Sequence, residues 1–142
     1  NVLFDLGGEL RALGAHPEGR AWRVAIRDPL DGTASFGALR LRDGQAVATS
    51  GVGEQGYALN GRVYGHIVDP SRGRPADRGL RSVTVVDDDA MMADGWATAL
   101  FAAGGQAGHD MANAFGIAAL FLAEADGAIV PTRSEAMRGM LL

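Results

Sequence analysis

The sequence predicts an α+β fold, in which an antiparallel sheet carries two helices packed on one face. Short segments with apolar alternation, separated by glycine-containing turns, fill the first part of the chain. Two stretches with helical composition then follow one another in the second part. Because the strands precede the helices instead of alternating with them, we expect an antiparallel sheet with the helices against it.

The N-terminal part is predicted to begin with two separate strands. Val2–Leu6 is a short apolar strand that breaks at Gly7-Gly8. We expect these two glycines to permit close backbone packing at the sheet edge, with a role in a pocket as the second interpretation. Trp22–Arg27 alternates apolar and polar residues, which is the pattern of a half-buried strand.

Two dipeptides predict two-residue hairpins further along the chain. Asp43-Gly44 lies between two candidate strands, and so does Asn60-Gly61. The flanking strands are expected at 38–42 and 45–49 for the first hairpin, and at 57–59 and 62–64 for the second.

The helical part begins after a β-branched strand at 82–86. Asp89 is the predicted N-cap of a helix over Ala90–Ala103, which two glycines end. A second helix is predicted over 106–115, with Gly116 as its stop signal.

The C-terminal part is expected to return to the sheet. A strand is predicted at 117–124, with a short partner at 128–130 across Asp126-Gly127. Ser134 is the expected cap of a short terminal helix over 134–142.

Composition excludes several classes of site and partner. The net charge of -4 argues against a nucleic-acid partner. The chain has no Cys, so neither a disulfide nor a thiolate metal site exists in it. No segment is apolar over the length that a membrane-spanning helix needs. All 13 basic residues are Arg, for which genome composition is the simpler explanation and phosphate recognition the functional one.

Asp94 and Thr98 form the most informative pair in the chain. They are four positions apart, so on a helix both oxygens lie on one face, one turn apart. Two oxygen donors near a helix N-terminus suit a Mg²⁺ ion that also holds substrate phosphates. The simpler explanation is that Asp94 stabilises the helix dipole and that Thr98 bonds back to the preceding turn.

His66 adds a titratable group at the end of a predicted strand, before the turn at Asp69-Pro70. An imidazole can accept a proton near neutral pH, although a strand His is more often structural. A metal–phosphate clamp with a nearby base suggests chemistry on a phosphoanhydride. The remaining histidines, His16 and His109, are expected to be solvated.

The order and spacing of these pieces resemble the ApbE family, the FAD:protein FMN transferases. The resemblance covers most of the chain. It is carried by Asp5 to Glu9 with Gly14, Trp22 to Pro29, Ala48 to Gly51, Tyr64 to Pro70 followed by Gly73 to Pro75, Ser82 to Val85, and Asp94 to Leu100. Family members resemble this chain only in their C-terminal portion, so residues 1–142 are expected to be that portion, with the N-terminal half absent.

The resemblance implies a T-fold-like architecture and assigns roles to residues. Asp94 and Thr98 match the Mg²⁺ ligands of the family, whereas Ala97 is not expected to be one. His66 matches a residue thought to assist proton transfer from the acceptor. Val68, through its main chain, contacts the flavin nucleotide in the family.

Two neighbouring features of the sequence complete the predicted site. Ser50-Gly51 resembles a family turn beside the same pocket, although such a pair is also a good turn by itself. Asp69 either orients His66 or caps its own turn, and we favour the turn. Gln55 departs from the family, in which an Arg is frequent at this position.

The implied activity is a Mg²⁺-dependent transfer of FMN from FAD to a Thr hydroxyl of an acceptor flavoprotein, with release of AMP. With water as acceptor, the same site would be an FAD pyrophosphatase. A non-catalytic FAD-binding protein and an inert fragment are competing hypotheses. The resemblance also implies a periplasmic location, either free or anchored to the inner membrane through a lipoprotein signal outside this chain.

Overall fold

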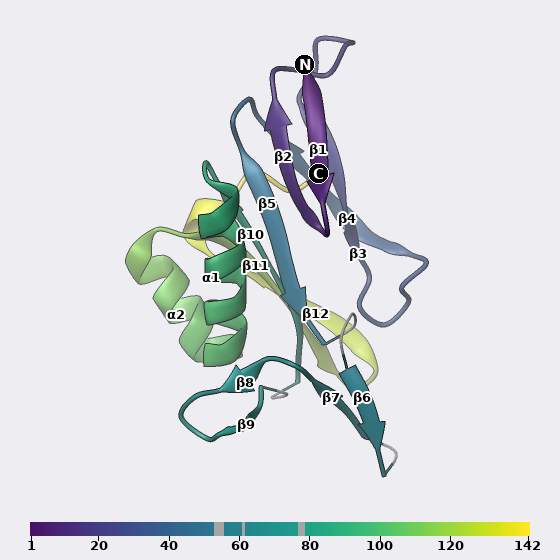
Figure 1. Cartoon of the computed structure of the whole chain (residues 1–142), viewed down its shortest axis with the longest axis vertical. Helices are drawn as coiled ribbons and strands as arrows, with labels where there is room; N and C mark the ends of the chain where they lie inside the picture. Colours follow the sequence, from purple (N-terminus) through teal and green to yellow (C-terminus); the bar gives the residue numbers. More distant parts are fainter. Residues whose placement is uncertain (53–55, 61, 77–78) are drawn as a thin grey trace.

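The computed structural model describes residues 1–52, 56–60, 62–76 and 79–142. Its main feature is a six-stranded antiparallel sheet with the order β1-β2-β5-β10-β11-β12 (Figure 1). The strands of this sheet are β1 (Val2–Leu6), β2 (Glu9–Leu13), β5 (Ala46–Gly51), β10 (Leu80–Asp87), β11 (Ala118–Ala125) and β12 (Ala128–Arg133).

Smaller elements surround this sheet. Three two-stranded ribbons pair β3 (Trp22–Arg27) with β4 (Ser35–Leu41), β6 (Gly56–Leu59) with β7 (Arg62–Gly65), and β8 (Val68–Asp69) with β9 (Arg74–Pro75). The helices are α1 (Ala90–Ala103), α2 (Gly105–Phe115) and a 3-10 turn at Glu135–Met137. In the part of the chain that the structure describes, no helix is long and apolar enough to cross a membrane.

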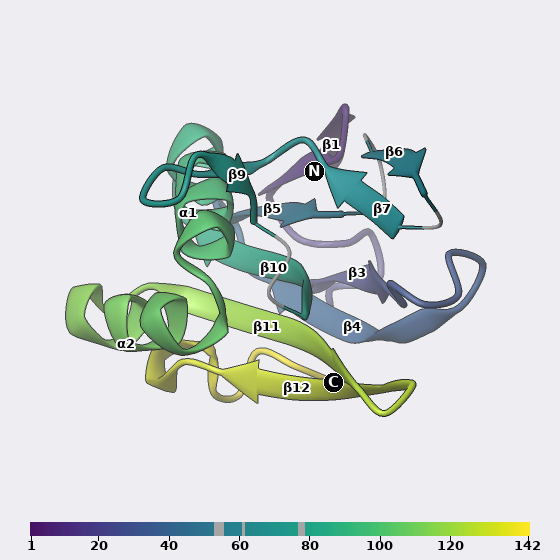
Figure 2. The ribbon, with the colours of Figure 1, turned by 90° about the horizontal axis from the view of Figure 1, so that it is seen from below.

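The two faces of the sheet are covered by different layers (Figure 2). Helices α1 and α2 pack on one face, over β5, β10 and β11, which confirms the predicted α+β arrangement. The β3–β4 ribbon packs on the other face through Leu39. Successive residues of a strand point to opposite faces, so Phe121 of β11 joins the core under the helices and Leu120 joins the core under the ribbon.

The ends of the helices follow the predicted signals. Asp89 caps α1, since its side chain accepts the N–H groups of Met91 and Met92 at 2.8 and 3.4 Å. Gly116 ends α2 in the left-handed conformation with φ of 68°. The helix boundaries were therefore readable from local chemistry alone.

The hairpin predicted across Asp43-Gly44 is wrong in its pairing. The turn is tight, because the Gln45 N–H donates to the Arg42 carbonyl at 3.1 Å. However, β4 pairs with β3, whereas β5 pairs with β2 and β10. Asp43 holds the turn by accepting the Gly14 N–H at 2.7 Å. The chain therefore crosses here from the ribbon to the main sheet, and a local turn signal could not reveal which strands pair.

The other predicted hairpins are confirmed. Strands β6 and β7 pair with Leu59 opposite Arg62, as expected around Asn60-Gly61, although Gly61 lies outside the described residues. Strands β11 and β12 pair across Asp126-Gly127. The β12 strand is longer than predicted and continues to Arg133.

The Gly7-Gly8 pair does not serve the close packing that was its first predicted role. It forms a turn that returns the chain as β2, a strand that the sequence did not predict. The φ angles are 72° and 110°. Within the described residues, a Cβ added to Gly8 would meet nothing within 4 Å. Glycine is therefore needed here for backbone conformation and not for close packing.

The terminal helix predicted over 134–142 is also wrong. Only Glu135–Met137 forms a turn of 3-10 helix, and Ser134 makes no capping bond to it. The buried Ser134 hydroxyl instead donates to the Ile117 carbonyl at 2.7 Å and accepts the Ala119 N–H at 2.9 Å. The Ser134 hydroxyl is therefore occupied by tertiary hydrogen bonds and does not cap the helix.

Candidate functional site

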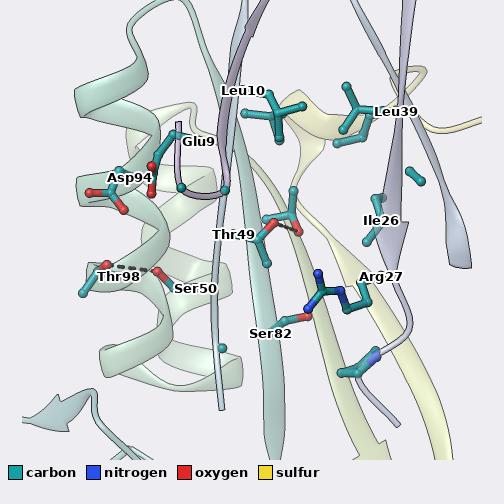
Figure 3. A pocket seen from close by; sticks show the side chains of 18 of the residues that line it. Glu9, Leu10, Ile26, Arg27, Leu39, Thr49, Ser50, Ser82, Asp94 and Thr98 are labelled. Carbon is teal, nitrogen blue, oxygen red and sulfur yellow. Dashed lines mark hydrogen bonds between the residues drawn. The ribbon is translucent and has the colours of Figure 1, made fainter. Parts of the chain in front are cut away.

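The predicted pair Asp94 and Thr98 lies on the exposed side of α1 that faces the end of β5 (Figure 3). Ala93 and Ala97 precede each of them and are fully buried against the sheet. This packing fixes the rotation of α1, so the carboxylate and the hydroxyl project side by side at the margin of the helix. The pair is not an isolated solvated face, because both residues line a cavity.

Ser50 meets this pair from the sheet. Its hydroxyl lies 2.9 Å from the Thr98 hydroxyl, and either oxygen can be the donor. The neighbouring Thr49 points to the opposite face of the sheet, where its hydroxyl lies 2.9 Å from that of Thr84. The end of β5 thus presents hydroxyl groups on both faces.

These groups share one cavity of about 420 Å³. It runs from α1 past the end of β5 to the β3 side of the sheet. The predicted site residues that line it are Ser50, Gly51, His66, Asp94 and Thr98. The structure therefore brings five of the six predicted site residues together, from segments far apart in the sequence.

His66 lies between β7 and β8 and is exposed. The next residue, Ile67, is buried in the core under the helices and anchors this segment. Val68 pairs with Pro75 in the β8–β9 ribbon, and its side chain is 52% exposed. Val68 is not one of the described residues that line the cavity, so its predicted main-chain contact with the nucleotide stays a prediction.

Asp69 holds its own turn. Its carboxylate is buried and accepts both the N–H and the hydroxyl of Ser71, at 2.9 and 2.6 Å. Its carbonyl also accepts the N–H of Gly73 at 2.9 Å. The favoured turn role is confirmed. Gln55 lies outside the described residues.

The other histidines are half-buried and have partners outside the cavity, so they are less solvated than predicted. His109 lies with its Nε2 atom 3.1 Å from the Arg133 carbonyl, and its ring packs edge-on against Phe121. His16 packs edge-on against Trp22. Both rings are part of local packing.

Four charged residues that line the cavity were not among the predicted site residues: Asp5, Glu9, Arg27 and Arg81. Glu9 follows the Gly7-Gly8 turn, and Figure 3 shows its carboxylate projecting into the same space as that of Asp94. Arg27 ends β3 and reaches into the cavity from the other side. The glycine turn was a usable signal for Glu9, but nothing local marked Arg27.

The donor set fits a hard cation. Asp94, Thr98 and Ser50 offer only oxygen atoms, the ligand type that Mg²⁺ prefers. Among the described residues, no group of three or more His, Cys, Asp or Glu residues is placed to hold a metal alone. The residues therefore suit a cation that takes its remaining ligands from water and from the phosphates of a bound molecule.

The sequence matches one protein family and several of its characterised members. The model of the ApbE family matches residues 1–121. The FAD:protein FMN transferase of Rhodobacter capsulatus is 38% identical over 98% of this chain and 27% of its own length. That of Vibrio cholerae is 34% identical over 99% of this chain and 42% of its own length.

Solved structures show the same fold. The flavinyl transferase ApbE of Pseudomonas stutzeri, in its apo form, has a TM-score of 0.81 at 37% identity, covering 97% of this chain and 42% of that one. The ApbE protein of Thermotoga maritima has a TM-score of 0.84 at 32% identity, covering 96% and 43%. The chain thus spans less than half the length of these relatives.

Proposed function

Because this chain belongs to the ApbE family, we propose that it forms part of an enzyme that transfers FMN from FAD to a Thr hydroxyl of an acceptor protein and releases AMP. The proposal rests on one observation: the side chains of Asp94, Thr98, Ser50 and His66 line the same cavity. Each of these groups has a task in phosphoryl transfer.

The reaction joins the acceptor oxygen to the phosphorus atom next to riboflavin. The bond between this phosphorus and the oxygen of the AMP phosphate breaks, and AMP leaves with that oxygen. The proton of the Thr hydroxyl must be accepted during the attack, because a neutral hydroxyl is a poor nucleophile. We assign this proton to the His66 imidazole, which lines the cavity beside the end of β5.

Asp94, Thr98 and Ser50 would hold Mg²⁺ together with the pyrophosphate. When bound, the cation supplies charge neutralisation of the phosphate oxygens. Asp94 contributes the negative charge of the donor set. Thr98 can donate its proton to Ser50 and keep its lone pairs for the cation, so the hydrogen bond between the hydroxyls orients the donor.

Two further functions would use the same groups. An FAD pyrophosphatase would take water in place of the Thr hydroxyl, and a non-catalytic carrier would bind FAD alone. The carrier hypothesis explains these residues least well. A protein that only binds FAD has little need of an imidazole and a cation-holding pair in the same cavity. The relatives are named as transferases of FMN to protein, which favours transfer over hydrolysis.

The test is FMN transfer by the full-length protein that contains these residues. Incubation with FAD, Mg²⁺ and a candidate acceptor should add the mass of an FMN group to the acceptor and release AMP in equal amount. EDTA should stop both. Release of AMP without labelling would favour the pyrophosphatase, and FAD binding without AMP release would favour the carrier.

A further inference from the structure

The edge of β5 beside the cavity has a strand partner over only part of its length. Strand β10 pairs with β5 on one side throughout, whereas the ladder with β2 on the other side ends at Leu10↔Val47. Gly8 donates its N–H to the Asp5 carboxylate at 3.1 Å instead of continuing that ladder. Figure 1 shows β5 extending beyond the β1–β2 hairpin. Within the described residues, this leaves the edge at 49–51 uncovered by a strand.

The pairing identifies the backbone groups on this edge. The Ala12 N–H donates to the Gln45 carbonyl at 2.8 Å, so the groups of Gln45 face β2. Backbone groups in an antiparallel strand face its two sides in alternation. The N–H and carbonyl groups of Thr49 and Gly51 therefore face the open edge, while those of Ser50 face β10. Paired donors and acceptors two residues apart are the pattern that an extended polypeptide complements.

The direction of the Ser50 side chain indicates where the target Thr of an acceptor would lie. Ser50 points to the helix face, where its hydroxyl contacts Thr98. In an added antiparallel strand, the residue opposite Ser50 has its Cβ about 5 Å away on the same face. A Thr at this position would direct its hydroxyl toward Asp94 and Thr98.

The neighbours of that Thr would point to the other face of the sheet. There the cavity is lined by Thr49, Ser82 and Thr84, and Figure 3 shows Arg27 pointing toward Ser82. The space beside Gly8 is open, because an added Cβ there meets no described atom within 4 Å. The side chains that flank the Thr in such a strand would therefore meet polar groups.

We propose that the acceptor polypeptide docks as an antiparallel strand on the β5 edge at 49–51, with its target Thr opposite Ser50. This proposal rests on the proposed function and names how that function recognises its partner. An antiparallel addition agrees with every pairing in the main sheet. FAD lacks the alternating amide pattern that this edge complements.

The test uses backbone N-methylation of the acceptor, which leaves the enzyme unaltered. The probes are short synthetic peptides with one central Thr, assayed for FMN transfer by the full-length protein. In the proposed register, the N–H groups of the two residues flanking the Thr face Gly51 and Thr49. Methylation of either should lower transfer roughly tenfold, since it removes a hydrogen bond and adds bulk at the edge.

Methylation of the target Thr amide is the matched control. This N–H faces away from β5, so transfer should stay within about a factor of three, although the methyl group is nearer to the reacting hydroxyl. Equal effects at all three positions, or the largest effect at the Thr, would overturn strand docking. Labelling of an intact acceptor protein but of no peptide would also overturn it. Labelling of neither would mean that the proposed function itself has failed.

A variant of the enzyme gives a second measurement. Thr49→Pro removes the edge N–H, and a proline is tolerated on a free strand edge. We expect it to raise the KM for the peptide roughly tenfold above that of Thr49→Val, which keeps the N–H, with similar FAD affinity in both. Equal KM values would overturn the proposal, and so would a selective loss of FAD affinity in the Pro variant. If Thr49→Pro does not fold, the methylated peptides still decide the question.

Discussion

The hydroxyl groups of Ser50 and Thr98 lie 2.9 Å apart, although 48 positions separate them in the chain. This contact joins the end of β5 to the middle of α1, and a carboxylate, two hydroxyls and an imidazole line one cavity there. The strand supplies a rigid edge and the helix supplies the carboxylate of Asp94. Both elements are held by the buried core under the helices, so the geometry of the site is built into the packing.

Asp94→Asn should strongly reduce FMN transfer in the full-length protein and leave the fold intact. The carboxylate is exposed at the cavity and is the charged member of the proposed cation site. Its loss should lower the transfer rate about a thousandfold, because a cation held at the phosphates contributes several kcal/mol. The measurement is transfer against Mg²⁺ concentration, with circular dichroism as a fold control.

Asp110→Asn is the matched control for that experiment. Asp110 is an exposed acid on α2 that accepts a hydrogen bond from Gln106 and does not line the cavity. Its variant should transfer FMN at the wild-type rate. Near wild-type transfer by Asp94→Asn would contradict the metal assignment.

His66→Ala should lower the rate of transfer much more than the affinity for FAD. A general base contributes about 10²–10⁴-fold in rate and little in ground-state binding. Added imidazole should restore part of the lost rate. Stopped-flow transfer assays and FAD titration measure the two effects, with His16→Ala as the control, since His16 lies outside the cavity. Equal losses of rate and affinity would make His66 a binding residue.

Gly108→Ala should destabilise the protein, although Ala normally favours a helix. A Cβ at this position would lie 2.5 Å from the Leu100 carbonyl oxygen and 3.1 Å from the Phe121 ring. We expect a loss of about 1–3 kcal/mol in the free energy of unfolding in urea. Gly95→Ala on α1 meets nothing within 4 Å among the described residues and should gain about 0.5–1 kcal/mol. Similar effects of the two substitutions would contradict the close helix contact.

The isolated 142-residue chain should bind FAD weakly and transfer no FMN. Asp94, Thr98 and Ser50 supply only part of the near-octahedral oxygen shell of Mg²⁺, and the chain spans 42% of the solved Pseudomonas stutzeri relative. Missing contacts worth about 4 kcal/mol would weaken binding roughly a thousandfold. Isothermal titration with FAD and Mg²⁺ tests this expectation. Micromolar binding by a monomer would show that the pocket is complete in these residues.

Much of the fold could be predicted because its signals are local. The Asp89 cap, the glycine that ends α2 and the turn at Asp126-Gly127 depend on residues a few positions apart. The wrong predictions concern long-range partners. Asp43-Gly44 is a genuine turn, but pairing of its flanking strands is decided by β3 and β10, which lie elsewhere in the chain.

The sequence by itself determined the spacing of Asp94 and Thr98 on one helix face, because helix geometry follows from local hydrogen bonds. Only the tertiary structure decided that Ser50, His66 and Glu9 reach the same cavity, since that depends on how β2, β5 and α1 pack. The same holds for the open edge of β5. Strand alternation can be read along a sequence, but which edge stays unpaired is fixed only when the whole sheet has formed.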